Sequence, residues 1–340
     1  MRFALHRHPL RYADGMQVFT ASSGPIGALE ELYLHAAWPG GEGWGEARAN
    51  IAYASGVAAE RVPDLVAEAL IPLIAAPDAA VALDLLAGAA AHPLARNLVE
   101  SALLEGLARQ GGVAVSTMLG AEPGATPAVA SNQCIFAGTT LDAAVARARR
   151  YAAEGFRDNK IRLGDEAPAA EAERVRAIRR AVGDGVHLAV DANGTWDVAE
   201  SVARLRLLDG LGLDYVEQPT PPGDWAAFAE VQARTGLAVM ADEGLKTEAD
   251  LAALMRLGPP FLAHLKLPKS GGPRALLAQA RALQAAGIGV MVGQMNEGAL
   301  ATAATVQAAL AVRPAHAELY GAYGIADDPA QGLSYRDGKA

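Results

Sequence analysis

From about residue 126 onward the chain alternates short apolar runs with longer amphipathic stretches. Short apolar runs are typical of buried strands, whereas apolar residues at three-and-four spacing are typical of helices. Stretches such as LDAAVARARRYAAEG also end near a glycine, as expected for a left-handed helix cap. The predicted strands are residues 128–135, 159–163, 187–191, 213–217, 237–241, 262–266, 288–293 and 315–319. Eight strands separated by seven helices predict a parallel βα barrel, because parallel strands need long crossover connections.

The first part of the chain has a different pattern. Strand-like segments at residues 3–10 and 29–38 are followed by a Pro-Gly-Gly turn and by GWGEA at residues 43–47. Helical spacing appears around residues 62–74 and 93–110. Strands followed by helices predict an α+β unit. The loop GAEPGATP then separates this unit from the regular βα pattern.

Charged residues end several of the predicted strands at nearly constant spacing. Asp191, Glu217, Asp242 and Lys266 are separated by 26, 25 and 24 residues, which is the length of a βα unit. Barrel enzymes carry their chemistry at the C-terminal ends of the strands. A single aspartate at a strand end is more often a helix cap, but four charged residues in register are hard to explain as caps. The spacing therefore predicts one shared site.

The second barrel strand adds two cations to this site. Lys160 and Arg162 alternate along the strand, so both side chains point to the same side, here the barrel interior. Three carboxylates on adjacent strands would repel one another unless a cation lay among them. A hard cation with oxygen ligands, Mg²⁺ or Mn²⁺, is therefore predicted at Asp191, Glu217 and Asp242. Lysines flanking such an ion suit removal of a proton from the carbon next to a carboxylate.

Composition narrows the class of protein. Hydrophobic residues make up 51% of the 340 residues, which is ample for a large core, and the net charge of −9 argues against a nucleic-acid partner. Cys134 is the only cysteine, so neither an intrachain disulfide nor a multi-cysteine metal site is expected. The N-terminus has no apolar core of signal-peptide length. We expect a cytoplasmic homo-oligomer that binds no membrane and takes a small carboxylic acid as substrate.

The ordered motifs KxR, DAN, EQP, ADE, KLxKxGG and GxMNE, preceded by GWGEA, resemble the enolase superfamily. The resemblance is to its muconate lactonizing enzyme-like subgroup, within the mandelate racemase/muconate lactonizing enzyme family. It implies a (β/α)7β modified TIM barrel with an N-terminal α+β capping domain. The implied boundaries are residues 1–125 for the cap, 126–325 for the barrel, and 326–340 for a C-terminal tail that returns toward the cap.

The resemblance also implies a reaction. The expected activity is Mg²⁺-dependent abstraction of the α-proton of a carboxylate through an ene-diolate intermediate. The enzyme would be an isomerase of cycloisomerase or racemase type, or a lyase that dehydrates hydroxy acids or sugar acids. The family's metal ligands fall on the three acids already chosen. Catalytic roles fall on Lys266, as acid/base, and on Lys160, which would neutralise a substrate oxygen. Asn193 and Glu243 match positions that surround the metal.

Arg162 departs from the family, which usually has a second acid/base lysine at this position. Arginine remains charged because its pKa is above about 12. We therefore expect Arg162 to stabilise charge or to bind the substrate carboxylate, although a role as base stays open. This asymmetry favours a cycloisomerase or dehydratase over a racemase. The alternative is a metal-binding barrel that has lost catalysis and serves as a binding or regulatory protein.

Candidate substrate-binding residues come from three regions. They are Gln17, Thr20 and Ser22 in a possible lid, Arg48, Asn50 and Tyr53 after GWGEA, and Asn132, Gln294, Asn296, Glu297 and Glu318 at strand ends. The ELYG segment that contains Glu318 resembles ELFG of muconate and chloromuconate cycloisomerases, whereas the polar candidates favour a hydroxylated acid. Lys269 is interpreted as a structural or surface cation, and His264 as a core histidine with satisfied polar atoms.

Overall fold

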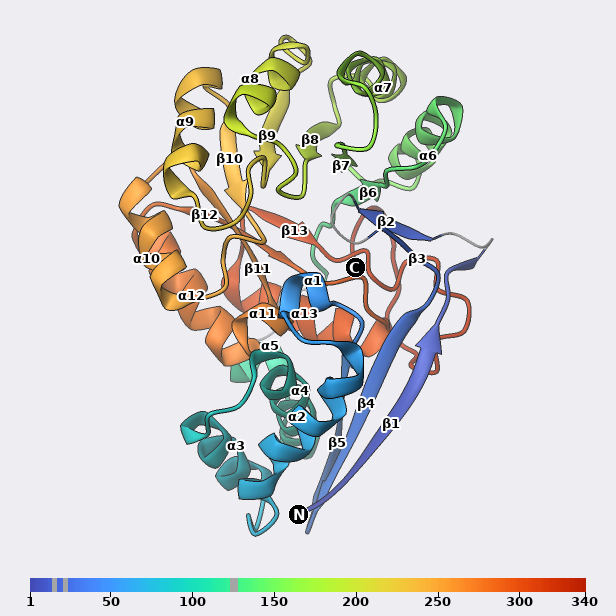
Figure 1. The fold of residues 1–340 in the computed structure, drawn as a ribbon. Helices are drawn as coiled ribbons and strands as arrows, with labels where there is room; N and C mark the ends of the chain where they lie inside the picture. Colours follow the sequence, from blue (N-terminus) through green and yellow to red (C-terminus); the bar gives the residue numbers. More distant parts are fainter. Residues whose placement is uncertain (14–16, 21–23, 123–127) are drawn as a thin grey trace.

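A computed structural model describes residues 1–13, 17–20, 24–122 and 128–340. Figure 1 shows an N-terminal cap beside a barrel of strands surrounded by helices. The cap contains an antiparallel sheet in the order β1-β4-β5 and a hairpin of β2 and β3. Its strands are β1 (Arg2–Leu10), β2 (Val18–Thr20), β3 (Gly24–Ile26), β4 (Leu29–Trp38) and β5 (Gly41–Arg48). Its helices are α1 (Ala52–Ser55), η2 (Ala59–Arg61), α2 (Val62–Leu70), η3 (Ile71–Leu73), α3 (Ala79–Gly88), α4 (Pro93–Gly111) and α5 (Val115–Met118).

The glycines of GWGEA allow the long helix α4 to approach the cap sheet. A Cβ atom added at Gly43 would lie 2.0 Å from the carbonyl oxygen of Ala102, and one at Gly45 would lie 2.4 Å from that of Leu98. No side chain fits at these distances. The glycines of this motif therefore set the spacing between β5 and α4.

The barrel is an eight-stranded parallel sheet in which each strand pairs with its neighbours in the chain, in the order β6 to β13. The strands are β6 (Gln133–Ile135), β7 (Asp158–Arg162), β8 (His187–Asp191), β9 (Leu213–Glu217), β10 (Ala238–Ala241), β11 (Leu262–Lys266), β12 (Gly289–Gly293) and β13 (His316–Glu318). The helices are α6 (Leu141–Ala153), α7 (Pro168–Val182), α8 (Val198–Arg206), α9 (Trp225–Thr235), α10 (Glu248–Leu257), α11 (Leu267–Ser270), α12 (Pro273–Ala285) and α13 (Ala299–Val312). The predicted fold class is confirmed.

The first barrel strand is shorter than predicted. Residues 128–132 were expected to extend it, but Val129 pairs instead with Ala340, through main-chain bonds of 3.0 Å in both directions. The N–H group of Ser131 likewise donates to Gly338 at 3.0 Å. The N–H group of Asn132 donates to Ala317 of β13 at 2.8 Å, which links the first and last strands.

The C-terminal segment, residues 326–340, contacts two parts of the molecule. Ala326 donates its N–H group to Arg11 at 3.0 Å, and Asp327 accepts from the N–H group of Arg11 at 2.7 Å, so this part contacts the cap. The last residues, by contrast, pair beside β6. The first part of the segment thus contacts the cap, and its last residues lie beside β6.

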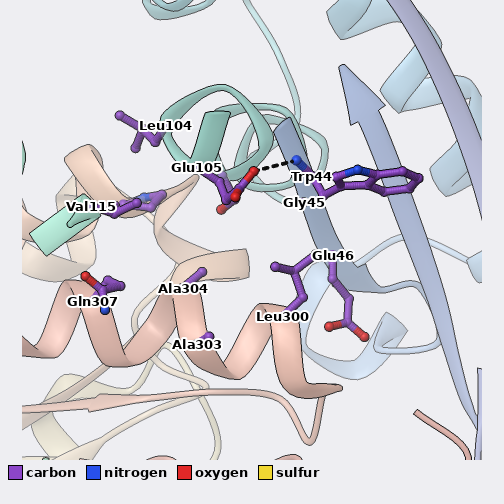
Figure 2. Close-up of a pocket in the computed structure, with 12 residues that line it drawn as sticks. Trp44, Gly45, Glu46, Leu104, Glu105, Val115, Leu300, Ala303, Ala304 and Gln307 are labelled. Atoms are coloured by element: carbon purple, nitrogen blue, oxygen red, sulfur yellow. Dashed lines mark hydrogen bonds between the residues drawn. The ribbon is translucent and has the colours of Figure 1, made fainter. Parts of the chain in front are cut away.

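An apolar cavity lies between the cap and α13. Figure 2 shows Gly45, Glu105 and Val115 of the cap beside Leu300 and Ala304 of α13, which all line this space. The ring of Trp44 points away from it. The main-chain N–H group of Trp44 donates to Glu105 at 3.0 Å at the edge of the cavity. Contact between the two domains is thus incomplete at this place.

Closer to the barrel mouth the cap and barrel meet through buried charges. Arg48 of β5 donates to the main-chain oxygen of Met295, in the loop after β12, at 2.8 Å. Glu46 accepts from the N–H group of Ala301, in the first turn of α13, at 2.8 Å. Glu31 is fully buried, and neither of its carboxylate oxygens has a partner among the described residues.

No helix in the described ranges is long and apolar enough to cross a bilayer.

Candidate active site

The charged residues that end the barrel strands lie together at one mouth of the barrel. Asp191, Glu217 and Lys266 are the last residues of β8, β9 and β11, and Asp242 directly follows β10. Parallel strands bring these ends to the same edge, and all four residues are at most 5% exposed. The chain therefore concentrates opposite charges in a volume with little water.

Lys160 of β7 lies at the bottom of this group, fully buried. Its ammonium nitrogen is 2.9 Å from Glu217, 3.5 Å from Asp191 and 2.5 Å from Glu318 of β13. Burial alone would lower the pKa of Lys160, but the three carboxylates outweigh it and raise the pKa well above its ordinary value. Lys160 is therefore a fixed positive charge.

Two lysines share Asp242. Lys266 donates to Asp242 Oδ2 at 2.6 Å, while Lys269 donates to Oδ1 and, at 2.6 Å, to the main-chain oxygen of Asp242. Burial would raise the pKa of Asp242, but the two lysines hold it well below its usual range. The side chain of Lys269 is only 6% exposed, so of the two interpretations, a structural or a surface cation, the surface one is wrong. Spacing could not show this, because the contact depends on the short helix α11 that follows Lys266.

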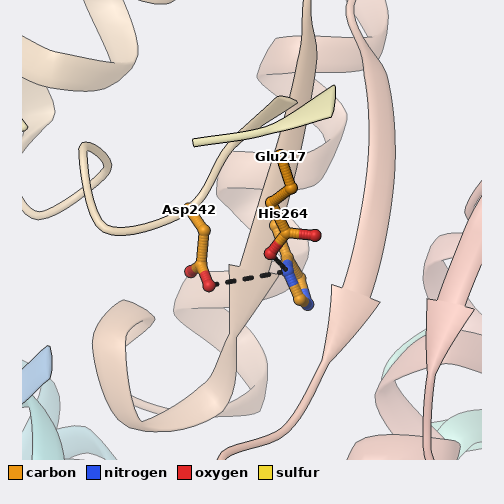
Figure 3. A group of neighbouring side chains, drawn as sticks. All are labelled: Glu217, Asp242 and His264. Atoms are coloured by element: carbon orange, nitrogen blue, oxygen red, sulfur yellow. Dashed lines mark hydrogen bonds and ion pairs between the residues drawn. The ribbon is translucent and has the colours of Figure 1, made fainter. Parts of the chain in front are cut away.

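His264 points into the same group of side chains. Its Nδ1 atom lies 2.9 Å from Glu217 Oε1 and 3.8 Å from Asp242 Oδ2 (Figure 3). Its Nε2 atom has no hydrogen-bond partner in the described part of the chain, so the expectation of a satisfied core histidine is wrong. Burial and the charge of Lys266 keep the pKa of His264 well below its ordinary value, so the ring is neutral. A neutral imidazole is a competent metal ligand.

Ligand atoms of Glu217, Asp242 and His264 all lie within 4.8 Å of one another, which makes these residues a candidate divalent-metal site. The predicted third ligand, Asp191, lies outside this group. The ammonium group of Lys160 contacts both Asp191 and Glu217. Asp191 is held by Asn193, whose main-chain N–H group donates to Oδ1 at 2.9 Å. The Asn193 amide group also donates to Glu243 at 3.0 Å. Asn193 thus connects two acids of the site.

The electrostatics of these acids fit a cation. Burial is the largest cause that raises the pKa of Asp191 to about 6 and those of Glu217 and Glu243 to about 7, and neighbouring carboxylates raise them further. The Oε2 atom of Glu243 has no partner in the ranges that the structure describes. Five carboxylates face four cations here, namely Asp191, Glu217, Asp242, Glu243 and Glu318 against Lys160, Arg162, Lys266 and Lys269. The four cations nearly balance the five acids.

Arg162 lies on the opposite side of the barrel from Lys266, because β7 and β11 are four strands apart in an eight-stranded sheet. Its Nη1 group donates to Asn193 at 3.2 Å, and its Nε group donates to the sulfur of Cys134 at 3.3 Å. The guanidinium group also lies 5.7 Å from the ring centre of Phe136. Burial alone would lower the pKa of Arg162, but interactions with Cys134, Asp191 and other nearby groups outweigh it and raise the pKa well above its ordinary value. The side chain is therefore a positioned cation.

A small pocket opens onto this site. Many of the residues that line it were predicted from the sequence as catalytic, metal-binding or substrate-binding residues. The lining residues are Tyr53, Ala54, Arg162, Asn193, Asp242, Glu243, Lys266, Lys269, Gln294, Met295 and Asn296. Tyr53 and Ala54 come from α1 of the cap, which contacts α11 of the barrel. The cap thus covers one side of the pocket, while Lys160, Asp191 and Glu217 are fully buried beneath it.

Other predicted residues lie elsewhere. Asn132 donates to Glu318 at 3.4 Å inside the barrel. Arg48 donates to Asn50 at 2.7 Å, and Glu297 accepts from the N–H group of Met295 at 3.1 Å; neither Arg48 nor Glu297 lines the pocket. Gln17 is exposed, Thr20 belongs to β2, and Ser22 lies outside the described residues.

A barrel with acids on three consecutive strands, covered by an α+β cap, defines the class of enolase-type (β/α)7β proteins. A family model described as "Enolase C-terminal domain-like" matches residues 143–339, and the chain belongs to this family. Muconate cycloisomerase 1 from Pseudomonas putida is 31% identical over 222 residues, which cover 65% of this chain and 59% of that protein. The match thus spans less than two thirds of the relative's length.

Two solved structures extend the similarity over the cap. Muconate lactonizing enzyme from Pseudomonas fluorescens, complexed with muconolactone, superimposes with a TM-score of 0.90 at 27% identity, and the match covers 99% of this chain and 92% of that one. A substrate-liganded complex of the L-Ala-D/L-Glu epimerase from Bacillus subtilis gives a TM-score of 0.88 at 25% identity, covering 100% and 95%. The predicted resemblance to the muconate lactonizing subgroup is confirmed.

Proposed function

We propose that this protein is a metal-dependent isomerase of cycloisomerase type, in which one lysine transfers the α-proton of a small carboxylic acid on one face while a bond at the neighbouring carbon is made or broken. The observation that carries the proposal is the pairing of Lys266 and Arg162 in one polar pocket, on opposite sides of the barrel. Arg162 keeps its charge, so Lys266 is the side chain of this pair that can exchange a proton. The names of the related proteins, which are cycloisomerases, epimerases and racemases, support an isomerase.

A divalent cation, Mg²⁺ or Mn²⁺, would be held by Glu217 and Asp242. The family resemblance supplies Asp191 as the third ligand, whereas the distances favour His264. Raised carboxylate pKa values and an unpartnered Glu243 oxygen among the described residues support this assignment. When bound, the ion would stabilise negative charge that develops on the substrate carboxylate.

The protein's own groups would divide the remaining work. Lys266 moves the proton at its Nζ atom, and it can accept one only when Asp242 no longer stabilises its charged form, as expected when Asp242 ligates a cation. Arg162, which lines the pocket, binds a substrate oxygen through its guanidinium group. Lys160 stabilises negative charge from below without titrating. Tyr53 of the cap helps to exclude water.

A dehydratase acting on a hydroxylated acid is the second candidate. It is favoured by the pocket lining, in which Gln294, Asn296 and Tyr53 offer hydrogen-bonding groups to a hydroxyl-bearing substrate. Loss of water would need an acid at the leaving hydroxyl group. If Lys266 is the only acid/base in the site, it would both accept the α-proton and donate a proton to the leaving hydroxyl group.

Deuterium exchange tests the proposal directly. The protein is incubated with Mg²⁺ in D₂O and with pooled mono-acids, di-acids and acylamino acids, and the α-carbon is examined for deuterium. We expect exchange with the parent protein and a loss of about 10²- to 10⁴-fold in Lys266→Ala, the usual cost of losing a general base. Metal binding without exchange across the whole pool would instead support the non-catalytic binding protein.

A further inference from the structure

Gln218 follows Glu217 directly and adopts an unusual main-chain conformation. Its φ angle is +35°, in the left-handed region that residues other than glycine rarely enter. In the described ranges, Asn193, Gln218 and Asn296 share this feature at the ends of barrel strands that border the site. Such conformations cost about 1–3 kcal/mol and persist only where surrounding contacts enforce them. The contacts around Gln218 therefore matter.

The main chain of Gln218 links three consecutive strands. Its N–H group donates to Met240 of β10 at 2.8 Å, and its carbonyl oxygen accepts from Gly194, just after β8, at 2.7 Å. Gln218 itself directly follows β9. These are the strands that carry Asp191, Glu217 and Asp242, so one residue connects the supports of all three acids.

The side chain of Gln218 adds a second connection. Its Oε1 atom accepts from the main-chain N–H groups of Asp242 at 3.0 Å and Gly244 at 2.9 Å, and its Nε2 group donates to Thr220 at 2.9 Å. The side chain is buried, and a flipped amide would set its NH₂ group against two N–H donors. These bonds therefore fix both the amide orientation and the position of Asp242.

We propose that Gln218 is a positioning residue that sets the separation of the Glu217 and Asp242 carboxylates for the cation, an inference that rests on the proposed metal site. The turn that brings the Gln218 side chain to β10 begins one residue after Glu217. Glu217 lies next to the main chain of Gln218, and Asp242 is bonded to its side chain. A shift of either the main chain or the side chain would therefore move one ligand relative to the other. Partners that orient metal ligands typically contribute 10- to 100-fold in metal affinity or activity.

Three variants separate this role from a general packing role. Gln218→Asn keeps an amide and tolerates the left-handed conformation, but its oxygen is one methylene short of the Asp242 N–H group. Gln218→Glu keeps the reach and accepts both N–H groups, although it loses the donation to Thr220. Asn97→Leu removes a buried amide from α4 of the cap, a helix that contributes no residue to the pocket lining, and serves as the matched control.

Metal affinity is measured by calorimetric titration with Mg²⁺ and with Mn²⁺, and thermal unfolding is measured without metal. We expect Gln218→Asn to weaken binding by about 10-fold or more. Gln218→Glu should bind at least as tightly as the parent, and Asn97→Leu should bind like the parent even if it unfolds at a lower temperature. Parent-like binding in Gln218→Asn, or weakening in Gln218→Glu equal to that in Gln218→Asn, would overturn the inference. A parent protein that binds neither metal would instead refute the proposed metal site.

Discussion

The buried carboxylate of Glu46 gives a sharp prediction for stability against pH. Glu46 is 1% exposed at the contact of the cap with α13, and its titratable neighbours are Tyr33, Glu31, Glu297 and Asp328. Burial, opposed in part by the hydrogen bond from Ala301, raises the pKa of Glu46 from its ordinary 4.5 to about 8. The carboxylates of Asp328 and Glu297 act in the same direction. The folded protein therefore keeps this proton at neutral pH.

The sign of the effect follows from proton binding. Between pH 4.5 and about 8 the folded protein holds a proton at Glu46 that the unfolded chain releases, so the free energy of unfolding falls as the pH rises. At about 1.4 kcal/mol for each pH unit, the full interval corresponds to a loss of up to about 5 kcal/mol. This contribution is fully present below pH 4.5 and is lost above about pH 8.

Urea denaturation of the parent and of Glu46→Gln at acid, neutral and alkaline pH tests this reasoning. Glutamine keeps an oxygen for the Ala301 N–H group but cannot ionise, so the two proteins should be similarly stable in acid. Above about pH 8 the variant should be more stable than the parent, by up to about 5 kcal/mol. Glu42→Gln removes an exposed carboxylate from the same strand and is the control. Parallel pH profiles for the parent and Glu46→Gln would refute the reasoning.

Two further predictions concern the site. Glu217→Gln should weaken Mg²⁺ binding, measured by calorimetry, by at least about 10-fold. Unchanged affinity would remove Glu217 from the set of ligands. The same titration of Asp191→Asn and of His264→Asn identifies the third ligand. Arg162→Lys should introduce a titratable amine on the second face, so that deuterium enters the opposite enantiomer in D₂O. If the parent already exchanges both enantiomers at similar rates, the one-sided mechanism is wrong.

The barrel was predictable because its signals are local. Each strand is a short apolar run, and the spacing of Asp191, Glu217 and Asp242 matches one βα unit, so the position of these residues along the chain fixes their place in the barrel. In the cap, α3 escaped prediction because Ala79–Gly88 is apolar on nearly every side and lacks an amphipathic pattern.

Side-chain partners were less accessible to sequence reasoning. The distance from Lys269 to Asp242 depends on the turn of α11, and the distance from His264 to Glu217 depends on barrel closure, so neither contact has a local signature. Alternation did place His264 on the same side of its strand as Lys266, which was the one signal for its position. Gln218 was visible in the EQP motif, but its double contact with the next strand was not.

Arg48 connects the cap to the wall of the pocket. Its guanidinium group reaches from β5 to the carbonyl group of Met295, and Met295 lines the pocket. Part of the pocket wall is thus supported by a domain that contributes none of the carboxylates. Selection for a new substrate would therefore act on cap and barrel as a pair. A chimera that joins this barrel to a relative's cap would have a pocket wall of altered shape unless that cap carried an arginine at the position of Arg48.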